Sequence, residues 1–323
     1  MIAALALLLP GAASAQFMGT IGNTSPFILS MDPQYPTPYS QVTITPLSDS
    51  LNFTRARMTA FVAGKEAYRG NAQPITVTLG KAGSVTNVKV IVSSSGANYN
   101  QTLSIQPQDV ALIAEPISSA PPLYPGKSLV PLGGNVRVVA LANLKNAQGG
   151  APDPATFSYA WTIDGAQSTN NSGIGKNAVI VGAPLQYRER TVSVVVLSAD
   201  GNLIGGASLS LSPLEPSVQM YENDPLLGIL YDHALSGSYS IAGAESTLYA
   251  APFSLPTTSG APLIRWFLNG NAAQTGSSIT LRPTGSGQGR ASLSLVASTN
   301  DYTTATASLS LSFGATGTNL FGL

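Results

Sequence analysis

Three short segments of the sequence repeat at intervals of about 100 residues, and this repeat constrains the fold more than any other feature. They are Phe61–Gly64, Thr162–Gly165 and Phe267–Gly270, and their final glycines lie 101 and 105 residues apart. Each segment ends in a small or turn-forming residue followed by Gly, which indicates a two-residue hairpin turn. Each is followed by a two-strand unit, and the closing runs of these units begin at Leu103, Leu209 and Leu309. Repeats of this length, with about seven short strands each, predict tandem β-sandwich modules.

Between the turns, apolar residues alternate with polar ones, for example in Ile75–Leu79, Val192–Val194 and Leu293–Leu295. Such alternation is typical of half-buried strands, and no stretch after the first residues keeps the 3.6-residue apolar period of a helix. Gly, Pro, Asn, Asp and Ser separate the runs and favour turns. The sequence therefore predicts an all-β chain.

The expected organisation follows from where the closing strand of each repeat ends. Gln106-Pro107 and Ser212-Pro213 come directly after closing strands, so the connectors between modules are only a few residues long. We expect a semi-rigid rod, since short connectors restrict motion between modules. The predicted segments are a signal peptide at 1–15, a linker at 16–27, sandwiches at 28–108, 109–213 and 214–313, and a tail at 314–323.

The N-terminal residues have the pattern of an export signal. Ile2–Pro10 is an unbroken apolar run, and Ala13-Ser14-Ala15 fits a signal-peptidase site with cleavage before Gln16. The run is far shorter than the roughly 20 residues of a membrane-spanning helix. No Lys or Arg precedes it, so an uncleaved membrane anchor is the main alternative. We expect no transmembrane span in the mature chain, which would be exported to the periplasm, the cell surface or the medium.

Composition excludes several classes of function. Charged residues make up 9% of the chain, and 15 basic residues balance 15 acidic ones. A neutral chain this poor in Lys and Arg is a bad candidate for nucleic-acid binding, which depends on neutralising phosphates. The chain has no Cys and one His, which excludes Cys-ligated zinc, thiol catalysis and disulfides. Each module must therefore depend on its own packed core.

Two of the repeated segments carry a resemblance to a known family. Trp161–Gly165 and Trp266–Gly270 resemble the Trp-x-x-x-Gly of immunoglobulin-like and PKD-like modules in bacterial surface proteins. The resemblance implies that the Trp packs between the sheets and that the Gly turns the chain beside it. In the first module Ala60 stands where the Trp would be, and we expect Phe61 to fill the space. The structural core residues so expected are Trp161, Gly165, Trp266, Gly270, Phe61 and Gly64.

Few residues suggest catalysis or metal binding. The single His233 follows Asp232, but no G-x-S-x-G accompanies the pair, so we interpret it as a loop histidine. Glu222 and Asp224 precede a proline, and with Asp232 they could offer oxygen ligands to calcium between two modules. The alternative is an Asn/Asp/Pro turn that leaves a strand. We expect no enzyme activity, no cofactor and no metal.

Modules two and three share an insertion after their first strand. It runs from Glu115 to Tyr124 in one and from Glu222 to Tyr231 in the other, nine residues in each case. The insertion is either a binding loop or a junction contact. We favour the junction, with the Tyr rings covering a sandwich edge or the neighbouring module and each Glu accepting backbone hydrogen bonds.

Two further features concern partners. Tyr35 and Tyr39 flank a proline-rich stretch, which would suit either a sugar-stacking platform or a stiffened linker. Module one has six basic and three acidic residues, whereas module three has three basic and six acidic. Opposite charges at the two ends would permit head-to-tail self-association, although salt screens such contacts beyond about 8–10 Å.

Taken together, the sequence predicts an exported, non-catalytic structural or interaction protein. It would be a spacer, adhesive unit or assembly subunit at the cell envelope, whose partner is an envelope protein, a polysaccharide or another copy. The first alternative is an adhesin module that binds a carbohydrate or protein ligand. The second is a secreted hydrolase.

Overall fold

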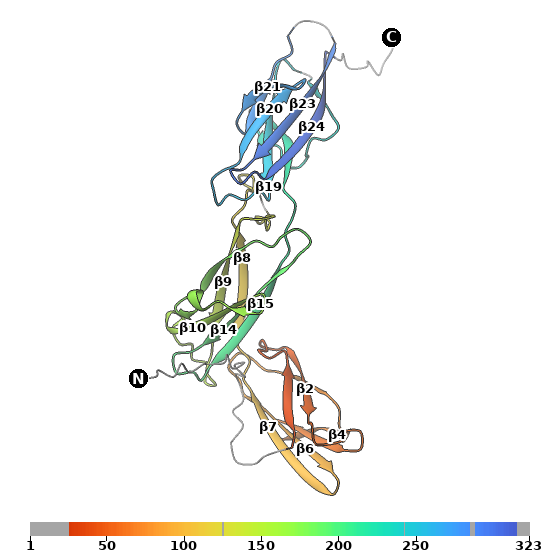
Figure 1. The fold of residues 1–323 in the computed structure, drawn as a ribbon, viewed down its shortest axis with the longest axis vertical. Coiled ribbons are helices and arrows are strands. Elements are labelled where there is room, and N and C mark those ends of the chain that lie inside the picture. Colours follow the sequence, from red (N-terminus) through yellow and green to blue (C-terminus); the bar gives the residue numbers. More distant parts are fainter. Residues whose placement is uncertain (1–25, 125, 242, 285–287, 315–323) are drawn as a thin grey trace, which may run out of the picture.

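The computed structural model describes residues 26–124, 126–241, 243–284 and 288–314. These residues form three β-sandwiches that follow one another along the longest axis of the molecule (Figure 1). In each sandwich, one sheet contains the first strand of the module, and the other contains its last two strands, which pair with each other. The all-β prediction is confirmed. The predicted signal peptide lies outside the described residues.

The first module pairs a three-stranded sheet with a four-stranded one. The smaller sheet has the order β1-β2-β5, and the larger has the order β4-β3-β6-β7. The pairs in these sheets are antiparallel. The strands are β1 (Ile28–Asp32), β2 (Gln41–Leu47), β3 (Arg57–Val62), β4 (Lys65–Asn71), β5 (Ile75–Thr78), β6 (Thr86–Ser94) and β7 (Ala97–Ile105).

The second module repeats this plan. Its sheets have the orders β13-β9-β8 and β11-β10-β14-β15, and β12 pairs with β10 beside them. Two short 3-10 turns, Pro154–Thr156 and Thr169–Asn171, flank β10. The strands are β8 (Asp109–Pro116), β9 (Asn135–Asn143), β10 (Ser158–Ile163), β11 (Ala166–Gln167), β12 (Gly173–Ile174), β13 (Ala178–Gly182), β14 (Arg190–Leu197) and β15 (Ile204–Leu211).

The third module adds one strand to each sheet. The orders are β17-β16-β19-β22 and β18-β24-β23-β20-β21, and β18 pairs with β24 in parallel. The strands are β16 (Ser217–Asp224), β17 (Gly228–Ile229), β18 (Ser238–Ile241), β19 (Ser246–Phe253), β20 (Leu263–Leu268), β21 (Asn271–Thr275), β22 (Ser278–Leu281), β23 (Gly289–Ser298) and β24 (Thr304–Phe313). None of the helical turns in the described ranges is long and apolar enough to cross a membrane.

Each sandwich has its own core, and the tryptophans occupy two of them. Trp161 and Trp266 are completely buried. Their indole nitrogens donate to backbone carbonyls at 2.8 and 2.9 Å, which satisfies the only polar atom of each ring. In the first module, Ala60 is buried at the equivalent point of β3.

The expectation that Phe61 fills this core position is not met. Phe61 is half-buried and does not belong to the core cluster of the first module. The physical reason is the two-residue period of a strand: Ala60 points inward, so its neighbour points to the other face. The larger core side chains of this module are Phe27, Ile44 and Met58.

The three repeated turns are two-residue hairpin turns, as the sequence predicts. Ala63, Asp164 and Asn269 each have φ of +49°, and the glycines that follow have φ between +80° and +82°. Positive φ at both central residues defines a type I′ turn, whose twist matches that of the paired strands. The three glycines are exposed turn residues and lie outside the core, contrary to their assignment as core residues.

This comparison gives a prediction for the first module. Ala63 is the least suited of the three residues to a left-handed conformation, because only Asn, Asp and Gly adopt it at low cost. Replacing Ala63→Asn, the residue present in module three, should therefore stabilise module one by about 0.5–1 kcal/mol. Thermal unfolding of the variant checks this. Ala67→Asn, in the exposed strand that follows, is the control and should not stabilise; an equal gain there would contradict the explanation.

Candidate functional site: the two junctions between the sandwiches

The connector between modules one and two is fixed by hydrogen bonds to both. Gln108 is almost fully buried, and its side-chain amide binds the backbone of Lys145: Lys145 N–H donates to Oε1 at 2.7 Å, and Nε2 donates to the Lys145 carbonyl at 2.9 Å. The backbone N–H of Gln108 donates to the carbonyl of Pro36 at 3.3 Å. One residue therefore holds a loop of each module, and both polar atoms of its side chain are paired.

Close approach of backbones completes this first junction. Gly83 donates its N–H to the Pro107 carbonyl at 2.9 Å and accepts a bond from the side chain of Gln106 at 3.0 Å. Its φ is +79°, and a β-carbon there would lie 2.3 Å from the carbonyl oxygen of Asn146. Only glycine allows the loop of module one to lie this close to module two.

Tyr35 fills the other side of the same junction. Its ring packs on Gly206 in β15, where an added β-carbon would lie 2.6 Å from the ring. Burial raises the pKa of Tyr35. Tyr39 is strongly exposed. The two rings therefore do not form the sugar platform considered from sequence: Tyr35 belongs to the packing between modules.

The second junction is a small β-ladder between modules two and three. Ser119 and Leu255 exchange backbone and side-chain hydrogen bonds: Ser119 N–H donates to the Leu255 carbonyl at 2.7 Å, and Leu255 N–H donates to Ser119 Oγ at 3.1 Å. The hydroxyl of Ser254, which is 1% exposed, donates to the carbonyls of Leu214 and Val130 at 2.9 and 3.2 Å. Three separate chain segments thus meet at one buried serine.

The insertions of modules two and three lie against this junction. The ring of Tyr124 packs edge-on against Phe253 of module three, with centroids 5.3 Å apart. Tyr231 packs edge-on against Tyr221 and Tyr249 at 5.2 and 6.5 Å. The insertion of module two therefore contacts the neighbouring module, whereas that of module three covers the outer face of its own sheet.

The buried and half-buried tyrosines of module three remain uncharged at neutral pH. Burial raises the pKa of Tyr221, Tyr231 and Tyr249. It also raises the pKa of Tyr239, and the negative charge of Glu222 raises it further. The hydroxyl of Tyr231 is buried without a hydrogen-bond partner among the described residues. The packing of the cluster therefore does not change with protonation near neutral pH.

The glutamates of the insertions do not act as expected. The carboxylate of Glu115 forms an exposed ion pair with Arg137 on the neighbouring strand β9. Glu222 accepts a hydrogen bond from Leu230 through its backbone carbonyl, not through its carboxylate. The expectation that both carboxylates accept backbone hydrogen bonds is therefore wrong. The repeated spacing places the two residues at equivalent points of their modules, but it carries no information on the direction of their side chains.

The acidic residues considered for calcium are not brought together. Asp224 accepts the N–H groups of Leu226 and Leu227 at 2.8 Å each, so its carboxylate closes the turn after β16. These bonds lower the pKa of Asp224. Asp232 and His233 lie exposed in a loop. Within the described ranges, no three Asp, Glu, His or Cys side chains are grouped to hold a metal ion.

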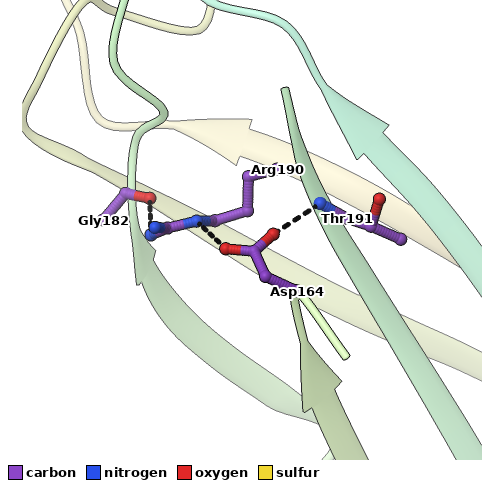
Figure 2. Close-up of polar contacts among 4 residues, drawn as sticks. All are labelled: Asp164, Gly182, Arg190 and Thr191. Atoms are coloured by element: carbon purple, nitrogen blue, oxygen red, sulfur yellow. Dashed lines mark hydrogen bonds and ion pairs between the residues drawn. The ribbon is translucent and has the colours of Figure 1, made fainter. Parts of the chain in front are cut away.

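A charged clamp ties the hairpin turn of module two to the end that faces module three. Asp164 accepts the N–H of Thr191 and the Nε of Arg190, both at 2.9 Å, and Arg190 also donates to the Gly182 carbonyl at 2.6 Å (Figure 2). Next to Gly182, the N–H of Ala183 donates to the carbonyl of Gly134. Gly134 lies against Pro256 of module three. The clamp therefore holds Gly182 in place next to Ala183, whose bond to Gly134 supports the contact with module three.

Comparisons with known proteins give structural likeness only. No protein-family model and no curated protein matches the chain. Solved structures with similar arrangement include three N-terminal domains of the outer capsid protein Hoc of bacteriophage RB49, 13% identical over 90% of this chain and 99% of that one, with a TM-score of 0.24. Another is the central fibronectin-III array of RIM-binding protein, 10% identical over 88% and 94%, with a TM-score of 0.29. A third is a Bacteroides ovatus glucan-utilisation protein, SGBP-B, in complex with a heptasaccharide, 13% identical over 88% and 70%, with a TM-score of 0.21.

The fold assignment comes from the chain's own strand order. In each module the first, second and fifth principal strands form one sheet, and the third, fourth, sixth and seventh form the other. Two facing antiparallel sheets, with a buried Trp on the third strand in two modules, are the architecture that immunoglobulin-like and fibronectin type III domains share. The described residues thus form a tandem array of three immunoglobulin-like β-sandwich modules.

Proposed function

We propose that the chain is an exported, non-catalytic spacer at the cell envelope that holds its ends at a fixed separation and presents surfaces for interaction. The observation that supports this most is the construction of the two junctions. Each contains a nearly buried polar side chain, Gln108 or Ser254, whose hydrogen bonds join separate segments. Flexible linkers are instead exposed and rich in Gly and Ser. The export itself rests on the sequence of residues 1–15.

Buried hydrogen bonds give the junctions directional stiffness. Leaving a buried donor or acceptor unpaired costs about 1–3 kcal/mol, so bending either junction until these bonds break is unfavourable. Interfaces between ordinary domains of one chain are loose and permit relative motion unless they are well packed. A rod with two fixed joints suits a spacer better than a chain that must reach for scattered ligands.

The absence of cysteine makes the rigidity directly measurable. Spin labels can be attached to exposed positions by Ala67→Cys with Ser208→Cys across the first junction, and by Ser208→Cys with Ala273→Cys across the second. Double electron–electron resonance should give a narrow distance distribution for each pair. A distribution as broad as that of an unstructured linker, for both pairs, would overturn the proposal.

Each junction also supplies the control for the other. Gln108→Ala removes both side-chain bonds to Lys145, and Ser254→Ala removes the bonds to Leu214 and Val130. Gln108→Ala should broaden only the distribution of the first pair, and Ser254→Ala only that of the second. Each should cost about 1–3 kcal/mol in unfolding free energy, because the Lys145 N–H in the first variant and the Leu214 carbonyl in the second lose their hydrogen-bond partner. No broadening in either variant would show that these residues do not hold the joints.

A further inference from the structure

The outer edge of β7 in module one is unlike the equivalent edge in module three. In module three, β18 pairs in parallel with β24, the equivalent last strand. In module two the equivalent strand, β15, also lies at the end of its sheet. No described strand pairs with the outer edge of β7.

The cause lies in the segment between β1 and β2. In module three the segment after the first strand, β16, provides β18, which covers the last strand. In module one this segment is drawn into the first junction instead, where Pro36 accepts a bond from Gln108 and Tyr35 packs on Gly206. The edge of β7 is therefore left open because its covering segment holds the junction.

The composition of β7 does not protect this edge. Exposed edges are usually blunted by charged residues, prolines or bulges, because their free N–H and C=O groups can pair with another strand. β4, at the opposite edge of the same sheet, carries Lys65, Glu66 and Arg69, and its pairing with β3 contains an irregularity. β7 is two residues longer and has no charged residue and no proline. Only one edge of the sheet is thus suited to accept a strand.

The geometry of the hairpin fixes which groups are free. The turn Ser95–Gly96 has two residues with positive φ, so Ser94 and Ala97 form a hydrogen-bonded pair. Alternate residues of β7, from Ala97 to Ile105, therefore bond to β6. The backbone groups that face outward belong to the residues between them: Asn98, Asn100, Thr102 and Ser104.

We propose that this edge binds the same edge of a second copy, by antiparallel pairing of β7 with β7 about a two-fold axis at Gln101. The register then places Asn100 opposite Thr102 of the other copy as a hydrogen-bonded pair, because both present their backbone groups outward. Tyr99 lies opposite Leu103 of the other copy, so two half-buried apolar side chains cover each other. The two four-stranded sheets become one continuous sheet.

The uncharged composition of β7 favours pairing with a second copy of β7 over pairing with a charged strand. The pairing brings no ionised side chain opposite another, since β7 has none. The nearest, Lys89 on β6, pairs with Thr102 and would lie more than three strand spacings, over about 14 Å, from its counterpart. That distance exceeds the Debye length of about 8 Å at physiological salt. The excess of basic residues in module one therefore does not oppose the dimer.

The two-fold axis allows a sharp test in this cysteine-free chain. Gln101→Cys places the two thiols opposite each other in a non-hydrogen-bonded pair, a spacing that a disulfide can bridge. Asn98→Cys lies on the same strand and is more exposed, but six residues separate the two thiols along the paired strands. Mild oxidation should give disulfide-linked dimers of Gln101→Cys at least about tenfold faster than of Asn98→Cys. Equal rates would overturn the proposal.

Two more measurements separate pairing from chance collision. Adding Asn100→Lys and Thr102→Lys to Gln101→Cys places like charges opposite each other. The oxidation rate should then fall to that of Asn98→Cys, with an unchanged thermal transition.

In the unmodified chain, amide hydrogen exchange at Asn100 and Thr102 should slow as the protein concentration rises. Exchange at Tyr99, whose N–H is bonded to β6, should not depend on concentration. Exchange independent of concentration would contradict the dimer. The spacer proposal does not depend on these outcomes, since they leave the label distances within one chain unchanged.

Discussion

Replacing Trp266 by alanine should lower the unfolding free energy of module three by about 3–5 kcal/mol. The side chain is completely buried between the sheets, so its removal leaves a cavity and abandons the bond from Nε1 to the Gly276 carbonyl. For a module of this size, the loss lowers the midpoint of its thermal transition by at least about 12 °C. Trp161→Ala should do the same to module two, where the Lys176 carbonyl loses its partner.

Calorimetry can assign these losses because each tryptophan belongs to a separate core. Trp266→Phe is the matched control: it keeps most of the ring volume and loses the hydrogen bond, so it should cost clearly less than the alanine variant. A loss below about 1 kcal/mol for Trp266→Ala would mean that the residue behaves as a surface residue. The alignment of the modules would then be wrong.

The second large effect is expected at Gly83, where a single methyl group should separate module one from module two. The β-carbon of Gly83→Ala would lie 2.3 Å from the Asn146 carbonyl oxygen and 2.6 Å from that of Lys145. Both atoms are backbone, so no side-chain rotation relieves the overlap. The junction must open, and the bonds of Gln108 must break with it. The label pair Ala67→Cys with Ser208→Cys should report a broad distance distribution, as wide as or wider than that of Gln108→Ala.

Gly64 provides the control for backbone strain. Its φ is +80°, almost the same as that of Gly83, but nothing lies within 4 Å of the place where its β-carbon would be. Gly64→Ala should therefore cost only the strain of the left-handed conformation, about 1–2 kcal/mol, and leave the label distances unchanged. If Gly64→Ala broadens the distribution as much as Gly83→Ala, the effect comes from destabilised module folding and not from the junction.

The local parts of the fold could be predicted from the sequence because their causes are local. An Asn-Gly or Asp-Gly pair between alternating strands specifies a type I′ hairpin by itself, and Asn269 and Asp164 do form one. Alternation also specifies which residues of a strand share a face. It would have placed Phe61 outside the core once Ala60 was aligned with the two tryptophans, so that error was one of interpretation and not of missing signal.

The junctions could not be predicted because their contacts join residues that are distant in sequence. Gln108 binds Lys145, 37 residues away, and the two residues alone show no pattern. One signal was present: Gly205 and Gly206 interrupt a strand that otherwise alternates, and glycine inside a strand often marks a close approach by another part of the chain. Both glycines do lie against neighbours, at the start of β8 and at Tyr35.

The strand order has a mechanical consequence. The chain enters module two at the first residue of β8, next to Lys145, and leaves it after the last residue of β15, next to the second junction. Tension along the axis therefore pulls β8 and β15 in opposite directions, each parallel to the eight residues with which it is paired on β9 or β14. In this shearing geometry the hydrogen bonds of a ladder share the load and do not break one after another. The module is thus arranged to resist pulling, which is governed by the rate of unfolding and not by equilibrium stability.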